Sequence, residues 1–312
     1  MHRRKHNKPI TKRKIFDLGQ FLLGIFAGLC ALAIFVCIDV LIQYVHEPHT
    51  KIITPVLETN RTMVKKLPSD IKKQIIAASP SATFRVPILL YHYVENIQDK
   101  KDKLRAELNV TPSVFEDQII TLKNAGYTFM TAKELGEVLD GKMAMPNKPI
   151  LLTFDDGHWD VATDILPILK KYNVKATAYI ITGFIGGSDF MTPEELHVVI
   201  DSGLVDVGAH TVHHLSLRGL PLERVKDEVD QSKTTLEQDY HVDAVSFAYP
   251  NGSFDQQAAQ VVKDDGFTTG VSTIPGVEQS QTNRYFMYRI RPGYRTGQAL
   301  LTWLNQDTFA AY

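Results

Sequence analysis

The chain has 312 residues, of which 44% are hydrophobic and 22% charged, so it can bury one large packed domain or two ordinary ones. This composition excludes disordered and fibrous proteins. The net charge of −1 is unevenly distributed, because seven of the 34 basic residues lie within the first fourteen, where there is no acid. The remainder carries 27 basic and 35 acidic residues. An acidic body without a basic stripe argues against nucleic acid as a partner.

An apolar segment follows this basic N-terminus. Residues 21–38 are eighteen residues without a charge, and residues 40–45 extend the segment past Asp39. A cleavable signal peptide has an apolar core of only about 7–15 residues, so the length favours a membrane-spanning helix. We expect a basic cytoplasmic tail at 1–15 and a single transmembrane signal anchor at 16–45. The rest of the chain would then face outward, because Lys and Arg favour the cytoplasmic side.

The next segment, residues 46–84, is expected to be a flexible stalk. It mixes four prolines with Lys, Thr and small residues, a composition that buries little surface. Both cysteines of the chain, Cys30 and Cys37, lie in the apolar segment. Residues 85–312, which we expect to form one folded domain, can therefore contain neither a disulfide nor a thiolate metal site.

In this expected domain, short apolar runs alternate with amphipathic stretches. The runs that predict strands are 86–91, 127–130, 149–154, 176–181, 205–207, 244–249, 268–272 and 286–290. Helix N-termini are indicated at Thr111-Pro112 (with Ser113 and Glu116 as an alternative cap), at Thr131 with Glu134, and at Thr192-Pro193 with Glu195. Strand followed by helix, repeated about seven times, predicts an α/β fold with a mostly parallel sheet. A (β/α) barrel, complete or incomplete, is the most economical arrangement.

Two carboxylates follow one of the predicted strands. Asp155 and Asp156 come directly after the run 149–154 and precede Gly157. Barrels and parallel sheets place their sites at the carboxyl ends of strands. Because successive strand residues point to opposite faces, both acids can serve one site only if the strand ends there, and Gly157 allows such a turn. A solvated Asp-Asp-Gly turn is the alternative.

Three histidines follow another predicted strand. His210 and His214 can face the same way in one helical turn, which suits two imidazoles on one metal ion, whereas His213 is not needed. An incidental histidine pair is the alternative. Thr211 stands where the helix motif of metalloproteases has Glu, so that motif is not met. Two imidazoles and one of the aspartates would hold a metal ion with an open position for water.

Together and in this order, the two clusters resemble the polysaccharide deacetylases of carbohydrate esterase family 4, the NodB-homology group. The first motif of that family, T-F-D-D, is matched by residues 153–156, and the second, H-[ST]-x-x-H, by residues 210–214. The resemblance covers roughly residues 85–292. It implies that residues 85–312 form a catalytic domain with a distorted (β/α) barrel.

The resemblance also implies roles for individual residues. It implies a divalent metal ion held by three side chains, Asp156, His210 and His214. The metal is usually Zn²⁺, with Co²⁺ and Ni²⁺ as alternatives for such ligands. Asp155 would be the general base, and the backbone N–H of Asn251 would stabilise the oxyanion. Leu90 and Tyr249 are candidates to line the pocket for the acetyl methyl group.

Two motifs depart from the usual pattern of the family. The third motif, R-x-P-Y in most members, corresponds to residues 248–251 and begins with Ala248, so the arginine that steadies the base is missing there. The last motif, L-x-H, is absent from residues 287–292 but is found at residues 90–92. This arrangement resembles the permuted branch that includes exported poly-N-acetylglucosamine deacetylases. It makes His92 the candidate general acid.

We therefore expect metal-dependent hydrolysis of acetamide groups on an N-acetylglucosamine-containing polysaccharide outside the cell membrane, giving free amine and acetate. The polymer could be poly-N-acetylglucosamine, peptidoglycan or a chitin-like chain. An O-acetyl esterase acting on a carbohydrate polymer is one alternative. A glycan-binding barrel that lost turnover with the missing arginine is another.

The expected membrane topology can be tested directly. A reporter fused after residue 312 should be exported, and deletion of residues 1–45 should give a soluble, active enzyme, because only the apolar segment would hold the chain in the membrane. Fractionation and reporter activity measure both outcomes. Recovery of the chain from the medium, cleaved near Ala33, would instead identify a signal peptide.

Overall fold

The computed structural model describes residues 82–97 and 101–310. These residues belong to one compact unit, Leu67–Tyr312. The predicted basic tail, the predicted anchor and the predicted stalk up to residue 81 lie outside the described residues. Within the described part of the chain, no helix is both long and apolar enough to cross a membrane.

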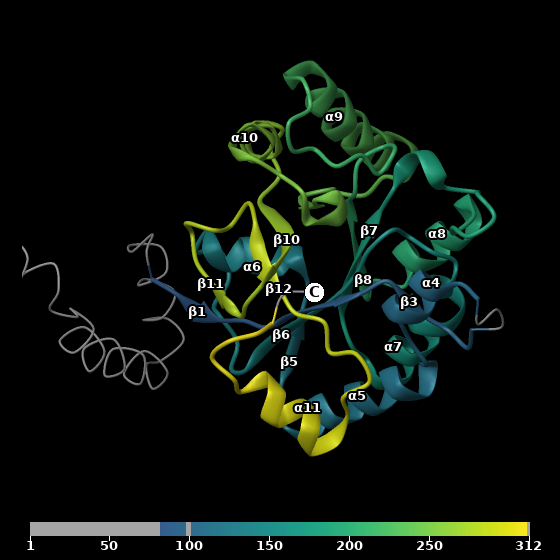
Figure 1. The fold of residues 1–312 in the computed structure, drawn as a ribbon, viewed down its shortest axis with the longest axis vertical. Helices are drawn as coiled ribbons and strands as arrows, with labels where there is room; N and C mark the ends of the chain where they lie inside the picture. Colours follow the sequence, from purple (N-terminus) through teal and green to yellow (C-terminus); the bar gives the residue numbers. More distant parts are fainter. Residues whose placement is uncertain (1–81, 98–100, 311–312) are drawn as a thin grey trace, which may run out of the picture. The chain divides into compact units, whose positions relative to one another are not determined.

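Eight strands form one parallel sheet that curls into a nearly closed barrel (Figure 1). Seven of them follow one another around the barrel: β2 (Ile88–Tyr91), β6 (Pro149–Phe154), β7 (Ala176–Ile180), β8 (Val205–Ala209), β9 (Ser246–Ala248), β10 (Thr269–Pro275) and β12 (Met287–Arg289). The eighth, β5 (Thr128–Met130), pairs only with the first half of β6. All eight apolar runs of the sequence are strands of this sheet, so the predicted parallel α/β fold is confirmed.

The barrel closes between its first and last strands. Leu89 and Ile290 form a parallel bridge. The N–H of Leu90 donates to the carbonyl of Ile290 at 3.0 Å, and the N–H of Ile290 donates to the carbonyl of Ile88 at 3.0 Å. This contact brings residues 90–92 beside residues 287–292.

Eight helices and several short elements complete the described fold, and Figure 1 shows most of the helices around the outside of the sheet. The helices are α4 (Lys103–Leu108), α5 (Pro112–Asn124), α6 (Ala132–Leu139), α7 (Leu166–Tyr172), α8 (Pro193–Asp201), α9 (Leu222–Asp239), α10 (Gln256–Asp264) and α11 (Gly297–Leu304). The short helical turns are η1 (Val161–Ile165), η2 (Thr182–Phe184) and η3 (Pro250–Gly252). Two small ribbons pair β1 (Phe84–Arg85) with β11 (Glu278–Gln279), and β3 (Tyr93–Val94) with β4 (Asn109–Val110).

The predicted helix starts are confirmed by their caps. Thr111 accepts from the N–H of Val114 and caps α5, so the alternative cap at Ser113 is not used. Thr131 and Thr192 each form a complete capping box, with Glu134 and Glu195 respectively. These boxes satisfy backbone donors that the first helical turn cannot pair internally.

Strand alternation separates two hydrophobic clusters, one on each face of the sheet. The larger cluster packs the outer face against the helices and includes Ala178 and Phe247. The smaller one contains Tyr179, Ala248 and several residues of α6. Tyr179 follows Ala178 and Ala248 follows Phe247, so neighbouring residues of a strand belong to opposite clusters. This alternation fixes the direction of the side chains at the strand ends.

Helix α6 packs against the amino ends of the strands through polar contacts at its own N-terminus. The N–H of Ala132 donates to the hydroxyl of Thr177 at 2.9 Å, and the N–H of Lys133 donates to the Asp206 carboxylate at 3.3 Å. Burial raises the pKa of Asp206 to about 6, against the opposing effects of the Lys133 N–H and the Lys133 charge. The carboxylate lies at the opposite end of β8 from His210.

The raised pKa of Asp206 predicts a pH-dependent contribution to stability. The folded protein holds this proton more tightly than the unfolded chain, whose Asp pKa is about 3.9, so wild-type stability should fall as the pH rises from about 4 to about 6. Asp206→Asn keeps the acceptor for Lys133 and removes the charge. We expect the variant to exceed wild type by about 1–3 kcal/mol at pH 8, with the difference vanishing towards pH 4.

Urea unfolding at several pH values measures this difference. Asp117→Asn, an exposed position on α5, is the matched control and should follow wild type throughout. A difference between Asp206→Asn and wild type that does not change with pH would contradict the assignment.

Candidate active site

The carboxyl ends of the barrel strands bring together most of the residues that the sequence identified. His92 follows β2, Asp155 and Asp156 follow β6, and His210 follows β8. Because the strands are parallel, these positions share one rim. Residues separated by more than a hundred positions along the chain therefore meet at one end of the barrel.

Three of these side chains form a cluster with the geometry of a metal site. The ligand atoms of Asp156, His210 and His214 all lie within 4.8 Å of one another. Asp156 Oδ1 is 3.4 Å from Nε2 of His210 and 3.4 Å from Nε2 of His214. His213 points elsewhere and is bound to Glu228.

The backbone at this cluster adopts the left-handed conformation, which non-glycine residues rarely take. The φ angles are 77° at Asp156, 65° at Thr211 and 56° at His214. Such strain is typical of functional sites, where the surrounding structure enforces it. At Asp156 the turn ends the strand alternation, so Asp155 and Asp156 can face one site, as the sequence argument required.

The donor atoms of the cluster suit a divalent cation. Nδ1 of His210 donates to the carbonyl of Ala248 at 2.7 Å, which leaves Nε2 as the free donor atom toward Asp156. Asp156 Oδ1 is buried and has no hydrogen-bond partner among the residues that the structure describes. A buried carboxylate oxygen between two imidazoles is placed to bind a cation, and two imidazoles with one carboxylate are a common donor set for Zn²⁺.

The pKa values within the cluster follow from burial and from its mutual contacts. Burial alone would raise the pKa of Asp156, but its close polar contacts with His158 and His210, both at 3.4 Å, and the His210 charge hold it well below its ordinary value. Burial lowers the pKa of His214, and the neighbouring His210 lowers it further. Asp156 is therefore an anion and His214 is disposed to be neutral, the protonation states that metal ligands require.

Asp155 is held by Arg289, a residue that the sequence reasoning did not assign to the site. Nη1 and Nη2 of Arg289 each donate to one carboxylate oxygen of Asp155, both at 2.6 Å. Nε of Arg289 donates to the carbonyl of Ser272 at 2.8 Å, and the Arg289 side chain is fully buried. Burial by itself would raise the pKa of Asp155, but the charge of and hydrogen bonds from Arg289 lower it. The arginine missing at Ala248 is thus replaced by one on β12.

The sequence contained one signal for this arginine. The segment 287–292, which lacks the expected histidine, contains two arginines and overlaps the predicted strand 286–290. Only the pairing of β12 with β10 and its bridge to β2 place Arg289 beside Asp155. Linear spacing does not reveal such a contact across 134 residues.

His92 lies at the bend between β2 and β3 and is partly exposed. Burial lowers the pKa of His92 to about 4, while the charges of Asp155 and Asp156 oppose this shift and those of Arg291 and Arg289 add to it. These influences place the imidazole within electrostatic reach of both aspartates. With a pKa of about 4, the His92 ring is uncharged at neutral pH when no substrate or metal ion is bound.

The other predicted substrate contacts are arranged differently. Leu90 is only 2% exposed, and Tyr249 is fully buried in the outer cluster, where its hydroxyl donates to the carbonyl of Tyr285 at 2.8 Å. Neither side chain therefore presents a surface to a substrate in this structure. Asn251 is exposed in η3 with a left-handed φ of 56°, and its side chain donates to the hydroxyl of Ser216 at 3.2 Å.

A second residue that the sequence reasoning missed is His158. Its ring stacks between Tyr93 and Phe190, with centroid distances of 4.2 and 4.9 Å, and Nδ1 donates to the carbonyl of Asp189 at 3.0 Å. Nε2 of His158 lies 3.4 Å from Oδ2 of Asp156. His158 thus approaches the carboxylate oxygen of Asp156 that faces away from His210 and His214. Its position two residues after Asp156 was the available signal.

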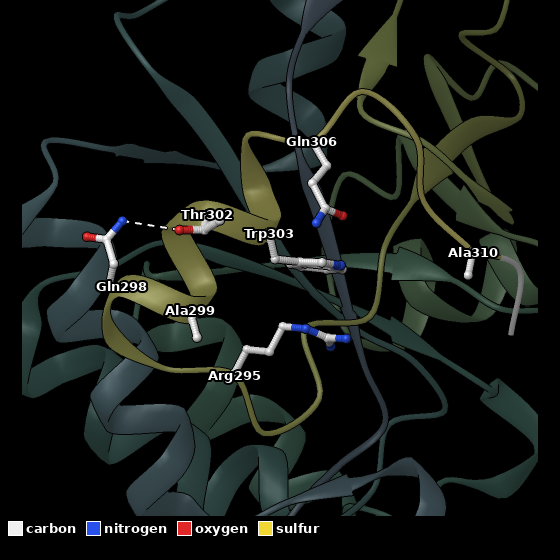
Figure 2. Close-up of a pocket in the computed structure, with 7 residues that line it drawn as sticks. All are labelled: Arg295, Gln298, Ala299, Thr302, Trp303, Gln306 and Ala310. Atoms are coloured by element: carbon white, nitrogen blue, oxygen red, sulfur yellow. Dashed lines mark hydrogen bonds between the residues drawn. The ribbon is translucent and has the colours of Figure 1, made fainter.

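A separate pocket of about 540 Å³ lies beside α11 (Figure 2) and is lined by Arg295, Gln298, Ala299, Thr302, Trp303, Gln306 and Ala310. The Arg295 guanidinium covers the Trp303 ring at 4.8 Å, and Phe309 packs against this ring edge-on at 5.3 Å. The aromatic ring is therefore already in contact with protein groups. The pocket shares no residue with the rim cluster, and we assign it no role.

The ion pair between Arg289 and Asp155 predicts a large coupling in stability. Arg289→Met would leave a buried, unpaired carboxylate and should lower the free energy of unfolding by about 3–5 kcal/mol. The double variant Asp155→Asn/Arg289→Met removes that charge and should be more stable than Arg289→Met alone. Urea unfolding measures both. Arg218→Met, an exposed arginine, should stay within about 0.5 kcal/mol of wild type. A double variant no more stable than Arg289→Met alone would contradict the buried pair.

Comparison with known proteins agrees with this geometry. The sequence model of the polysaccharide deacetylase family matches residues 142–270, which include both aspartates and both histidines of the cluster. A Bacillus subtilis protein, YxkH, whose name assigns it provisionally to the polysaccharide deacetylases, is 29% identical over 88% of this chain and 92% of its own length. A Staphylococcus aureus poly-β-1,6-N-acetyl-D-glucosamine N-deacetylase is 29% identical over 58% of this chain and 67% of its own.

Solved structures share the barrel. The Streptococcus pyogenes deacetylase PplD, solved in complex with acetate, superposes with a TM-score of 0.66 at 27% identity, covering 72% of this chain and all of that one. IcaB from Ammonifex degensii shares the fold with a TM-score of 0.61 at 22% identity, over 70% of this chain and 95% of that one. The resemblance inferred from the two motifs is confirmed. The chain therefore carries a NodB-like domain of the polysaccharide deacetylase type, matched over residues 142–270, and the proteins it resembles are named deacetylases, which are hydrolases.

Proposed function

We propose that this chain hydrolyses the acetamide groups of an N-acetylglucosamine-containing polysaccharide at the outer side of the cell membrane, releasing acetate and leaving free amines on the polymer. The observation that carries the proposal is the pairing of Asp155 with Arg289 directly beside the cluster of Asp156, His210 and His214. This places an ionised, oriented base next to a set of metal ligands. The name of the Staphylococcus aureus relative supports poly-β-1,6-N-acetylglucosamine as the first polymer to test.

Asp156, His210 and His214 would hold a divalent cation, with Zn²⁺ as our first choice and Co²⁺ or Ni²⁺ as alternatives. When bound, such a cation lowers the pKa of water and polarises the acetyl carbonyl. The chain's own contribution is to keep Asp156 ionised and to turn Nε2 of His210 toward it, through the bond from Nδ1 to Ala248.

Asp155 would accept the proton of the attacking water. Arg289 holds the carboxylate in one orientation and lowers its pKa, so it is an anion, and therefore an acceptor, at neutral pH. The fork of two parallel hydrogen bonds leaves one lone pair on each oxygen of Asp155 for the water. The backbone N–H of Asn251 would stabilise the oxyanion. Asn251 lies three residues after Ala248, whose carbonyl accepts the hydrogen bond from His210.

His92 would protonate the departing amine. Because its pKa of about 4 leaves the ring neutral at pH 7, we propose that its proton arrives during turnover. Asp155, the group whose charge raises the pKa of His92 most, is the proposed source after it has taken a proton from water. A protonated imidazole of low pKa is a strong acid and transfers its proton readily to an amine.

The location outside the cell membrane is proposed from the sequence, with the N-terminus in the cytoplasm. The seven basic residues before the apolar segment and the expected anchor at residues 16–45 support this orientation. The membrane and the polymer would thus be the two partners of the chain.

Substitution of the base tests the reaction. Asp155→Asn should lower turnover by about 10²–10⁴-fold because a carboxamide cannot accept the proton, while metal content stays unchanged. The assay measures acetate release from oligomers of β-1,6-linked N-acetylglucosamine, from peptidoglycan and from chitin oligomers, with and without a chelator. Asp117→Asn is the matched control and should retain wild-type turnover.

Three outcomes would redirect the proposal. Near wild-type turnover of Asp155→Asn would show that Asp155 is not the general base. Acetate release from O-acetylated polymers alone would identify an esterase. Binding of the oligomers without any release would identify a glycan-binding barrel.

A further inference from the structure

The histidine loop, residues 210–214, is held from outside the cluster by one side chain of α9. Glu228 is 1% exposed, and its Oε2 accepts from the N–H of Val212 at 3.0 Å and from the N–H of His213 at 2.8 Å. Its Oε1 accepts from Nδ1 of His213 at 2.9 Å and pairs with Nη2 of Arg224 at 2.8 Å. Two consecutive backbone donors between the metal-ligand candidates therefore end on one carboxylate oxygen.

Glu228 occupies a position where packing alone would favour an apolar residue. The buried residues of α9 are Val225, Glu228, Val229, Ser232 and Leu236, which form a single stripe. Burying a carboxylate is costly unless hydrogen bonds compensate it, and here four donors do so. Packing of α9 does not require the Glu228 charge. Three of the four donors to its carboxylate come from the histidine loop, and the fourth is Arg224.

The loop needs such support because its conformation is strained. The backbone of Thr211 and of His214 adopts the left-handed conformation, and the hydroxyl of Thr211 accepts from the N–H of His214 at 3.0 Å. On the other side, η2 donates from Thr182 and Gly183 to the carbonyls of Thr211 and Val212, at 3.1 and 3.0 Å. A Cβ at Gly183 would lie 2.5 Å from the Val212 carbonyl, so the loop is enclosed tightly between η2 and Glu228.

We infer that Glu228 is a positioning residue for the candidate metal site of Asp156, His210 and His214. By fixing the N–H groups of Val212 and His213, it sets the separation and direction of His210 and His214. It does not touch the cluster itself. This role rests on the proposed function, since it presumes that the two histidines bind a metal ion. Partners that orient ligands in this way typically contribute about 10–100-fold to metal affinity.

Two substitutions at Glu228 separate positioning from folding. Glu228→Leu completes the apolar stripe of α9 and supports helix packing, but it leaves both loop N–H groups without an acceptor. Glu228→Gln keeps one carbonyl oxygen that can accept from both N–H groups. Arg224→Ala is the matched control, because it removes a partner of Oε1 and leaves the two loop bonds in place.

The experiment titrates each full-length variant with Co²⁺ against a competing chelator and records the visible absorption of the bound ion. Glu228→Leu should bind Co²⁺ about 10–100-fold more weakly than wild type, with an altered spectrum. Glu228→Gln should recover most of the affinity, and Arg224→Ala should match wild type. Without metal, hydrogen exchange in peptides spanning residues 211–214 should accelerate in Glu228→Leu but not in Arg224→Ala.

The outcomes distinguish this inference from the proposed function. A folded Glu228→Leu protein with wild-type affinity, spectrum and exchange would overturn the positioning role and leave the proposed function intact. Equal losses in Glu228→Leu and Arg224→Ala would also overturn it, since the ion pair and not the loop bonds would then matter. A wild-type chain that binds no Co²⁺ at the cluster would overturn the metal site and this role together.

Discussion

The buried pair of Asp155 and Arg289 is the interaction on which the site depends. It joins the turn after β6 to β12, and the same guanidinium also reaches Thr153 at 3.2 Å and the Ser272 carbonyl. Nε, Nη1 and Nη2 of Arg289 all donate hydrogen bonds, which makes a fully buried charge tolerable. Asp156 follows Asp155 directly, so fixing Asp155 also fixes the turn from which Asp156 faces the two histidines.

Around this pair, rigid neighbours stabilise unfavourable local conformations. Left-handed residues occur at Asp156, Thr211 and His214, and each lies in a turn whose backbone is bonded to a neighbouring element. Burial and hydrogen bonding over-determine these turns, which is how a barrel rim holds side chains more accurately than free loops could. The accuracy of the cluster is therefore a property of the packing beneath it.

Much of this arrangement could be predicted from the sequence, and the failures have physical causes. Apolar runs gave the strands and threonine caps gave the helix starts, because both signals are local. Asp155, Asp156, His210 and His214 follow strand ends, so a parallel sheet brings them together. Arg289 could not be found in this way, because its contact exists only once the barrel closes. The motif predicts Tyr249 at the site, whereas alternation after Ala248 turns its side chain into the outer cluster.

The bridge between Leu89 and Ile290 has a consequence for the order in which the molecule can mature. Synthesis delivers the first strand of the barrel early and β12 almost two hundred residues later, counted between β2 and β12. Until β12 inserts, Asp155 lacks the Arg289 counter-ion and the barrel is open at the seam. The geometry of the rim cluster and the last step of barrel assembly are thus one event, so a nascent chain completes its candidate site only when its fold is complete.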